Sequence, residues 1–322
     1  MGSDDWHFTE DIDEFLARAG DFLLSRPVMH NTPLTTLEKL RTGGTDARGA
    51  GRQGGEGHGA GRHGAEEHGG DGHGAGRHGV ERPGAGTTVF GRLESNGEVH
   101  AILYRTPRGR LTVTTLSPGQ AHTLAARLAD LGHRFSGVTA DQHTAATFAE
   151  AWRRHSGGAA PVRDWWGRLY RLGTLTEPEP VPAGRGRLVG EREHEHLMRW
   201  CREFAADVGE TVSMDAESWA ATRFAEKRYT FWETPDGTPV AMAGANPLVG
   251  GQVRLDPVYT PARNRGRGYG AAVTVEVSRA ALAAGAREVV LFTNPANATS
   301  NALYQRIGYV PVTDFTGYAF SG

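Results

Sequence analysis

Apolar positions recur along the chain at two spacings, which predict alternating helices and strands. Recurrence at every third or fourth residue predicts a helix, and alternation or a short apolar run predicts a strand. In the first half, helices are expected at 11–24, 33–41, 120–131 and 145–154, and strands at 88–94, 99–106, 111–116 and around 138. Asp11 is placed to cap the first helix, and Asn96-Gly97 is a strong hairpin signal.

A second half begins near Arg185, after the proline-rich connector 177–182, a semi-rigid spacer. Here we expect helices at 191–207, 216–226, 268–284 and 299–307, strands around 188 and at 229–233, 240–245, 253–259 and 288–293, and a final hairpin at 309–320. Pro257 cannot donate to a sheet ladder, so the strand 253–259 is expected to be an edge strand or to carry a bulge.

Residues 42–86 differ from the rest of the chain. They hold 18 glycines among 45 residues and no aromatic residue, so they cannot bury enough apolar surface to offset their chain entropy, and disorder is predicted. Histidines 58, 63, 68, 73 and 78 recur at a period of five. Weak metal binding is one reading, but ordering glycine-spaced ligands is costly, which favours a solvated loop and no dedicated metal site.

Bulk properties narrow the functional classes. A chain of 322 residues suggests two domains, and a net charge of −2 with a pI near 6.7 offers no positive field for nucleic acid or anionic membranes. Cys201 is the only cysteine, which fits a reducing compartment. The start of the chain lacks a signal-peptide pattern, and no apolar run approaches the ~20 residues of a membrane helix. We expect a cytoplasmic protein, a monomer or a homodimer.

The most informative sequence is the loop Arg265-Gly266-Arg267-Gly268-Tyr269-Gly270, between an apolar strand and an amphipathic helix. Backbone amides at such a turn face the same way at the positive end of a helix dipole and form a pocket for phosphate oxygens. A Rossmann dinucleotide site would need an acidic residue at the end of the next strand. Glu288 lies at the start of that strand, which disfavours this alternative.

A second motif follows in the segment 297–304. Asn297, Ser300, Asn301 and Tyr304 are spaced i, i+3, i+4 and i+7, so they share one face of a helix. A polar stripe that ends in tyrosine, next to a buried strand, suits the wall of a ligand site.

Together the loop and this motif resemble the GCN5-related N-acetyltransferase (GNAT) family. The resemblance implies an α/β (α+β) fold with a mixed, mostly antiparallel central sheet flanked by helices, in two tandem copies. Residues 1–180 would be a degenerate copy with the insert at about 42–86, and residues 185–322 the catalytic copy. In the first half Ser117-Pro118-Gly119-Gln120 stands where the glycine loop is expected.

The resemblance also implies acetyl-CoA as co-substrate. Residues 265–270 would hold its pyrophosphate, the backbone of Val258 and Thr260 its pantetheine arm and thioester carbonyl, and Asn297 and Ser300 further parts of it. Tyr304 matches the general acid that protonates the leaving thiolate.

The general base stays open among Asp256, Glu233 and an ordered water. Direct transfer is favoured over a covalent intermediate because Cys201 is far from the loop in chain order. Trp219, Trp232 and Tyr229 are candidates for an acceptor pocket, although large aromatic residues are more often core.

The expected function is transfer of an acetyl group from acetyl-CoA to a primary amine of a small molecule or peptide. The alternative is a non-catalytic acetyl-CoA-binding regulatory or scaffold protein. Nothing in the sequence identifies the acceptor.

Overall fold

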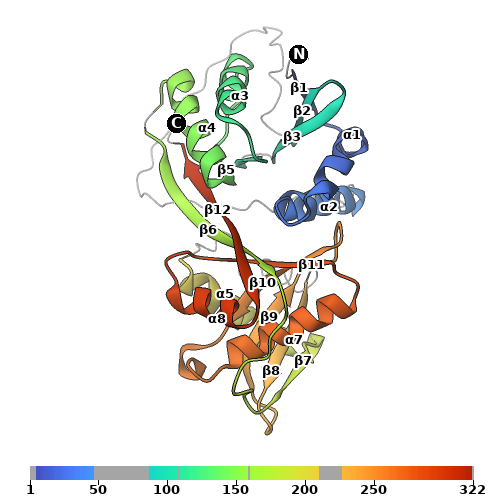
Figure 1. Cartoon of the computed structure of the whole chain (residues 1–322), viewed down its shortest axis with the longest axis vertical. Helices are drawn as coiled ribbons and strands as arrows, with labels where there is room; N and C mark the ends of the chain where they lie inside the picture. The colour runs from blue at the N-terminus through green and yellow to red at the C-terminus, as the bar shows by residue number, and fades with distance from the viewer. Residues whose placement is uncertain (1–4, 47–86, 107–108, 159, 210–226, 321–322) are drawn as a thin grey trace, which may run out of the picture.

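The computed structural model describes residues 5–46, 87–106, 109–158, 160–209 and 227–320, with side chains in helix α2 as far as residue 42 (Figure 1). The elements of the first half are β1 (Asp5–Thr9), α1 (Ile12–Ser25), α2 (Asn31–Asp46), β2 (Val89–Ser95), β3 (Glu98–Arg105), β4 (Leu111–Val113), α3 (Pro118–Asp130), β5 (Gly137–Asp141), α4 (Gln142–Ser156) and β6 (Val162–Leu172). Those of the second half are β7 (Arg185–Leu188), the 3-10 helix η1 (Glu191–Glu193), α5 (His194–Asp207), β8 (Arg228–Glu233), β9 (Pro239–Ala245), β10 (Gln252–Tyr259), the 3-10 helix η2 (Ala262–Asn264), α7 (Tyr269–Ala283), β11 (Glu288–Thr293), α8 (Ala298–Arg306) and β12 (Tyr309–Ala319).

In the described ranges the strands form one 12-stranded sheet, in the order β1-β2-β3-β4-β5-β12-β6-β11-β10-β9-β8-β7. The pairs β4–β5 and β10–β11 are parallel. The remaining neighbours are antiparallel. The expected mixed, mostly antiparallel sheet flanked by helices is therefore confirmed.

Two long strands connect the halves. β6 precedes the connector but pairs with β11 of the second half, whereas β12 pairs with β5 of the first half. β6 and β12 also pair with each other, and Figure 1 shows them running together from one lobe of the molecule to the other. Strand pairing thus crosses the expected division at residues 180–185, which stays a prediction.

The predicted hairpin at 309–320 is wrong, because β12 continues as one strand through Tyr309–Ala319. Its register shifts between Pro311 and Thr313 and between Gly317 and Tyr318. A bulge accommodates a proline, which has no N–H to give to the ladder. The partner that keeps β12 extended is β6, which the sequence pattern did not predict as a strand.

Local signals elsewhere act as expected. Asp11 caps α1, and its Oδ1 accepts hydrogen bonds from the amides of Asp13 at 2.8 Å and Glu14 at 3.1 Å. Asn96 and Gly97 take φ values of 53° and 81° in the turn between β2 and β3. Two consecutive residues with positive φ are the geometry of the hairpin turn that Asn-Gly favours.

The sheet of the second half carries an apolar core on each face. Phe231 and Trp232, neighbours on β8, belong to different cores, so these cores lie on opposite faces because strand side chains alternate. We call the face covered by α7 and α8 the α7 face; its core includes Leu255, Leu291 and Tyr304. The opposite side is the α5 face, on which α5 packs.

Helix α2 of the first half contacts strand β10 of the second. The Nη1 atom of Arg254 donates to Thr32 Oγ1 at 3.0 Å, and Gln252 Nε2 donates to Thr35 Oγ1 at 3.3 Å. The first half is therefore bound to the strand that leads to the glycine loop.

Candidate functional site

The sheet opens between β10 and β11. Leu255 and Leu291 are the last residues that these strands pair, and beyond them β10 continues beside β9 while β11 continues beside β6. β10 shifts register between Leu255 and Val258, which confirms the bulge expected at Pro257. The opening thus begins between Asp256 on one strand and Phe292 on the other.

The loop 265–270 presents backbone donors beside this opening. Gly266 and Gly268 have φ values of +76° and +81°, in the left-handed region that glycine adopts most readily. Gly268 caps α7 without a side-chain hydrogen bond. Among the described residues, the amides of residues 266–271 donate no hydrogen bond. Free amides at the positive end of a helix dipole are suited to an anion.

The two arginines of the loop are held differently. Arg265 forms an ion pair with Asp207, and its Nε donates to the carbonyl oxygen of Thr260 at 2.9 Å. Arg267 is exposed and makes no ion pair within the described part of the chain. Arg265 therefore braces the loop, whereas the guanidinium of Arg267 is available to a phosphate.

Tyr304 lies on α8, in the core of the α7 face with Leu255 and Leu291. The residue is 8% exposed, and its ring lies 6.3 Å from that of Tyr170 and 6.0 Å from that of Tyr309, between centroids. Burial raises the pKa of the Tyr304 hydroxyl, and the negative charge of Asp256 raises it further. The phenol accordingly stays protonated at neutral pH, and its hydrogen is available for donation.

The rest of the motif at 297–304 organises α8. Asn297 is the N-cap, and its Oδ1 accepts from the amide of Ser300 at 3.0 Å. Asn301 is buried and donates from Nδ2 to the carbonyl oxygens of Asn294 at 3.0 Å and Asn297 at 2.7 Å. The side chains of Asn297 and Asn301 thus make local bonds, and the cofactor roles expected of Asn297 and Ser300 stay predictions.

Asp256 is paired with a buried ammonium group. Lys227 Nζ lies 2.7 Å from Asp256 Oδ2 and donates to the Asp256 carbonyl oxygen at 2.9 Å. The Lys227 side chain is 5% exposed, whereas that of Asp256 is 36% exposed. The carboxylate is therefore fixed at the opening and still reaches solvent.

Glu233 has a different environment. Its Oε1 accepts from Arg187 Nε at 2.7 Å, and the side chain is 8% exposed. Arg187 also pairs with Glu193. The carboxylate of Glu193, and to a smaller extent that of Glu233, raises the pKa of the Arg187 guanidinium. The carboxylate of Glu233 is therefore engaged in a largely buried ion-pair cluster.

Comparison with known proteins matched the chain to a family model and to solved structures. The model of the family described as Acetyltransferase (GNAT) family matches residues 193–309. A tandem GNAT protein from the clavulanic acid biosynthesis pathway aligns with a TM-score of 0.52 at 15% identity, covering 99% of each chain. A Drosophila protein aligns with a TM-score of 0.57 at 12% identity, also covering 99% of each chain. A GCN5-related N-acetyltransferase from Kribbella flavida, 18% identical with a TM-score of 0.47, covers 69% of this chain and 87% of its own. No curated protein matched the sequence.

Residues 193–309 are a GNAT domain. The likeness to the tandem GNAT protein over almost the whole length shows that the two halves together have a tandem GNAT fold.

In the first half, the loop at 117–120 uses its backbone amides in hydrogen bonds to its own side chains. Ser117 Oγ accepts from the amide of Gln120 at 3.3 Å, and Gln120 Oε1 accepts from the amide of Ser117 at 3.0 Å. The amide of Leu116 donates to Thr144 Oγ1 at 2.9 Å. The amides of Ser117 and Gln120 at the start of α3 thus bind the chain itself, whereas within the described residues the amides of 266–271 at the start of α7 donate no hydrogen bond. This contrast agrees with the predicted degenerate first copy.

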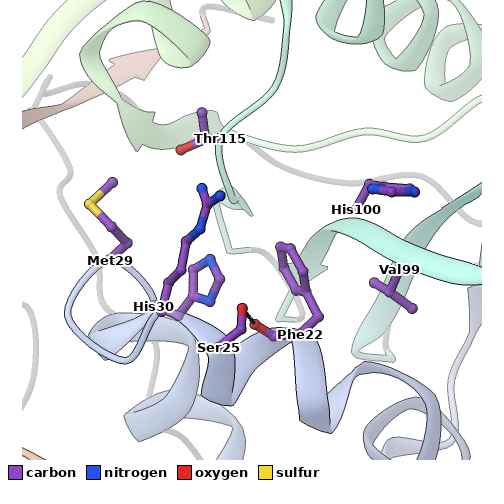
Figure 2. A pocket seen from close by; sticks show the side chains of 8 residues that line it. Phe22, Ser25, Met29, His30, Val99, His100 and Thr115 are labelled. Carbon is purple, nitrogen blue, oxygen red and sulfur yellow. Dashed lines mark hydrogen bonds between the residues drawn. The ribbon is translucent and has the colours of Figure 1, made fainter.

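The first half contains a separate cavity of about 210 Å³ between the end of α1 and strand β3. Figure 2 shows His30, Met29 and Thr115 on its walls. Thr115 follows β4, which pairs in parallel with β5 as β10 pairs with β11. The cavity does not include a residue of the GNAT domain.

Several other expectations have an outcome. Trp232 and Tyr229 are buried, at 7% and 3% exposed, as core residues of β8. Cys201 is fully buried on α5. Trp219, the helix expected at 216–226 and residues 47–86 of the histidine-rich insert lie outside the described residues. No helix in the described ranges could cross a membrane.

Sequence reasoning missed two residues near the opening, Tyr170 and Phe292. The hydroxyl of Tyr170 donates to Asn301 Oδ1 at 2.8 Å and accepts from Gln305 Nε2 at 3.1 Å. Tyr170 lies on β6, before the connector, and no local signal relates it to α8. Phe292 is one apolar residue in an apolar strand, and only the sheet order places it at the opening.

Proposed function

We propose that this protein is an acetyl-CoA-dependent N-acetyltransferase that transfers the acetyl group directly to a primary amine. The observation that carries the proposal is the run of amides at 266–271 that donate no hydrogen bond to any described residue, next to the place where β10 and β11 separate. Pyrophosphate oxygens would accept from these amides at the positive end of α7 and would also meet the exposed guanidinium of Arg267. The pantetheine arm would then enter the opening along Val258 and Thr260.

The chemistry follows from the groups around the opening. The amine nitrogen attacks the thioester carbonyl, a C–N bond forms, and the C–S bond breaks to release the thiolate. Asp256 accepts the amine proton, directly or through water, and the Val258 amide supports the oxyanion. Tyr304 protonates this thiolate, so that CoA leaves as the thiol. Cys201 takes no part, since it is fully buried on α5.

Of the two candidate bases, Asp256 is preferred. Both carboxylates are ion-paired, Asp256 with Lys227 and Glu233 with Arg187, but the Asp256 side chain borders the opening and is 36% exposed, whereas that of Glu233 is 8% exposed. The acceptor is proposed to be a small molecule or a peptide, encountered in the cytoplasm.

The test is isothermal titration of the full chain with acetyl-CoA, followed by detection of free CoA thiol in the presence of an amine panel. One site per chain is expected, because the first half binds its own loop donors. Two sites would mean that the loop at 117–120 opens to bind cofactor. Binding without transfer to any amine would favour a regulatory acetyl-CoA-binding protein, and absence of binding would overturn the proposal.

A further inference from the structure

Three aromatic rings lie together beside the opening. Phe292 of β11 is 5.9 Å from Trp165 of β6 and 5.6 Å from Phe315 of β12, between ring centroids, and both contacts are edge-on. All three side chains are partly exposed. We call them the ring cluster. Because β6 and β12 are the strands that link the halves, only the tandem arrangement brings these rings together.

Gly167 makes room for the ring cluster. A Cβ atom at Gly167 would lie 2.6 Å from Cζ2 of Trp165 and 3.3 Å from Cδ1 of Phe292. Gly167 is also the cross-strand partner of Phe315. The indole of Trp165 therefore lies over the backbone of β6 beside the ring of Phe292, a position that a side chain at residue 167 would block.

The ring cluster and Asp256 border the same space. Leu291 packs in the core of the α7 face, so Phe292, the next residue, points to the α5 face. Leu255 and Leu291 are partners in the parallel pair, which places Asp256 and Phe292 opposite each other where the strands separate. Asp256 also points to the α5 face, because it follows Leu255, another residue of that same core.

We propose that the ring cluster binds an aromatic group of the acceptor, so that the substrate is a small primary amine with an aromatic ring a short chain away from its nitrogen. This inference rests on the proposed acetyltransferase function. An aromatic group set against Trp165 and Phe292 loses contact with water and gains edge-to-face contacts. The ammonium end then lies towards Asp256, whose carboxylate attracts it and accepts its proton.

The test compares two amines that differ by a ring, phenethylamine and propylamine. We expect kcat/KM of the full-length protein, followed by CoA thiol release, to be at least tenfold higher for phenethylamine. Binding is measured separately by titrating phenethylamine into protein saturated with CoA, where no transfer occurs. Trp165→Ala should lower kcat/KM for phenethylamine at least tenfold, weaken its binding similarly, and change kcat/KM for propylamine less than twofold.

The control is the neighbouring tryptophan. Trp166 is the next residue of β6, so it points to the other face, and its Nε1 donates to Asp314 Oδ2 at 3.1 Å. Trp166→Ala should leave the preference between the two amines unchanged. Phe315→Leu, which keeps an apolar side chain of smaller size, gives a second variant of the ring cluster and should reduce the preference by a smaller factor.

The outcomes separate this inference from the proposed function. Phenethylamine binding that depends on Trp165, without transfer to either amine, would support the ring site and overturn the transferase. Transfer to both amines at equal kcat/KM, or equal effects of Trp165→Ala and Trp166→Ala, would overturn the ring site and leave the transferase intact. Lack of phenethylamine binding to the CoA-saturated protein would overturn the ring site whatever the activity.

Discussion

The hydroxyl of Tyr170 on β6 donates a hydrogen bond of 2.8 Å to Oδ1 of Asn301 on α8, across 131 residues of sequence. Asn301 in turn donates to the carbonyl oxygens that precede α8. A strand that comes before the connector thus fixes the start of the helix that carries Tyr304. The first half acts on the site of the GNAT domain through this bond, although its own loop is closed.

Tyr170→Phe tests that link. The substitution leaves the buried Oδ1 of Asn301 without its donor, so we expect the free energy of unfolding to fall by about 1–3 kcal/mol. Loosening of α8 should also lower kcat about tenfold, if Tyr304 acts as proposed. Urea unfolding and initial rates measure both effects. Tyr309→Phe removes a comparable bond, 2.8 Å to Ser278, and should cost stability with less than a threefold change in kcat. Equal losses of kcat in the two variants would contradict the link.

Tyr304→Phe removes the proposed proton donor and keeps the ring. Loss of a positioned acid typically costs a factor of about 10² or more, so kcat should fall by about that factor. The dissociation constant of acetyl-CoA, measured by isothermal titration, should change less than twofold because the loop 265–270 is untouched. Unchanged turnover would remove Tyr304 from the mechanism.

Gly268→Asp should abolish acetyl-CoA binding, because a carboxylate would sit among the amides that face the pyrophosphate. Gly268→Ala separates this charge effect from backbone strain. Gly285→Ala is the matched control. Gly285 follows the C-terminal end of α7, has a φ of +96°, and has nothing within 4 Å of the position that a Cβ would take. Both alanine variants should lose about 1–2 kcal/mol of stability. Retained binding in Gly268→Asp would show that the pyrophosphate lies elsewhere.

Asp256→Asn and Glu233→Gln distinguish the two carboxylates. If Asp256 is the base, its amide variant should lower kcat at least tenfold near neutral pH, with a smaller loss at high pH where the free amine is abundant. Glu233→Gln weakens the pairing with Arg187, so it should lower thermal stability and change kcat less than threefold. A large loss of kcat in Glu233→Gln with no loss in Asp256→Asn would reverse the assignment.

The burial of His30 makes the free energy of unfolding depend on pH. The residue is 4% exposed, and Nδ1 lies 3.1 Å from the carbonyl oxygen of Leu23. Burial lowers the pKa of His30 below 6.5, the ordinary value. The unfolded chain therefore binds the proton more readily, so the contribution of His30 is fully present above pH 6.5 and is lost as pH falls below it. Burial also lowers the pKa of His133 and His196, which adds to the effect.

Urea unfolding at pH 7.5 and 5.5 measures this dependence. His30→Gln should reduce the difference in unfolding free energy between the two pH values by up to about 1.4 kcal/mol, because pH 5.5 lies one unit below the ordinary pKa of 6.5. His100→Gln, at an exposed position, should leave the difference unchanged. An equal reduction in both variants would contradict the role of burial.

Local features of the fold could be predicted because their causes are close in sequence. Asn96-Gly97 turns the chain whatever surrounds it, since both residues tolerate positive φ. Asp11 caps α1 with bonds to residues two and three positions away. The same holds for the glycine loop: Gly266, Gly268 and the start of α7 lie within a few residues of one another.

The candidate site could be predicted only in part. Tyr304 and Asp256 were proposed from motif spacing and position on a strand, and their catalytic roles stay predictions. Burial and the charge of Asp256 raise the pKa of the Tyr304 hydroxyl. The ion pair that occupies Glu233 was not foreseen, since Arg187 lies 46 residues earlier, on the neighbouring strand β7. Tyr170 and the ring cluster were not foreseen either.

By itself, the sequence determined where helices begin, where strands turn, and which loop has an unusual backbone, because these depend on steric and hydrogen-bonding preferences of neighbouring residues. The tertiary structure decided the rest. It made residues 309–319 one strand instead of a hairpin, because β6 pairs with it along nearly its full length. It also set Phe292 beside Trp165 and Asn301 beneath Tyr170. Such contacts depend on which strands become neighbours, a choice made by burial of the whole sheet rather than by any one segment.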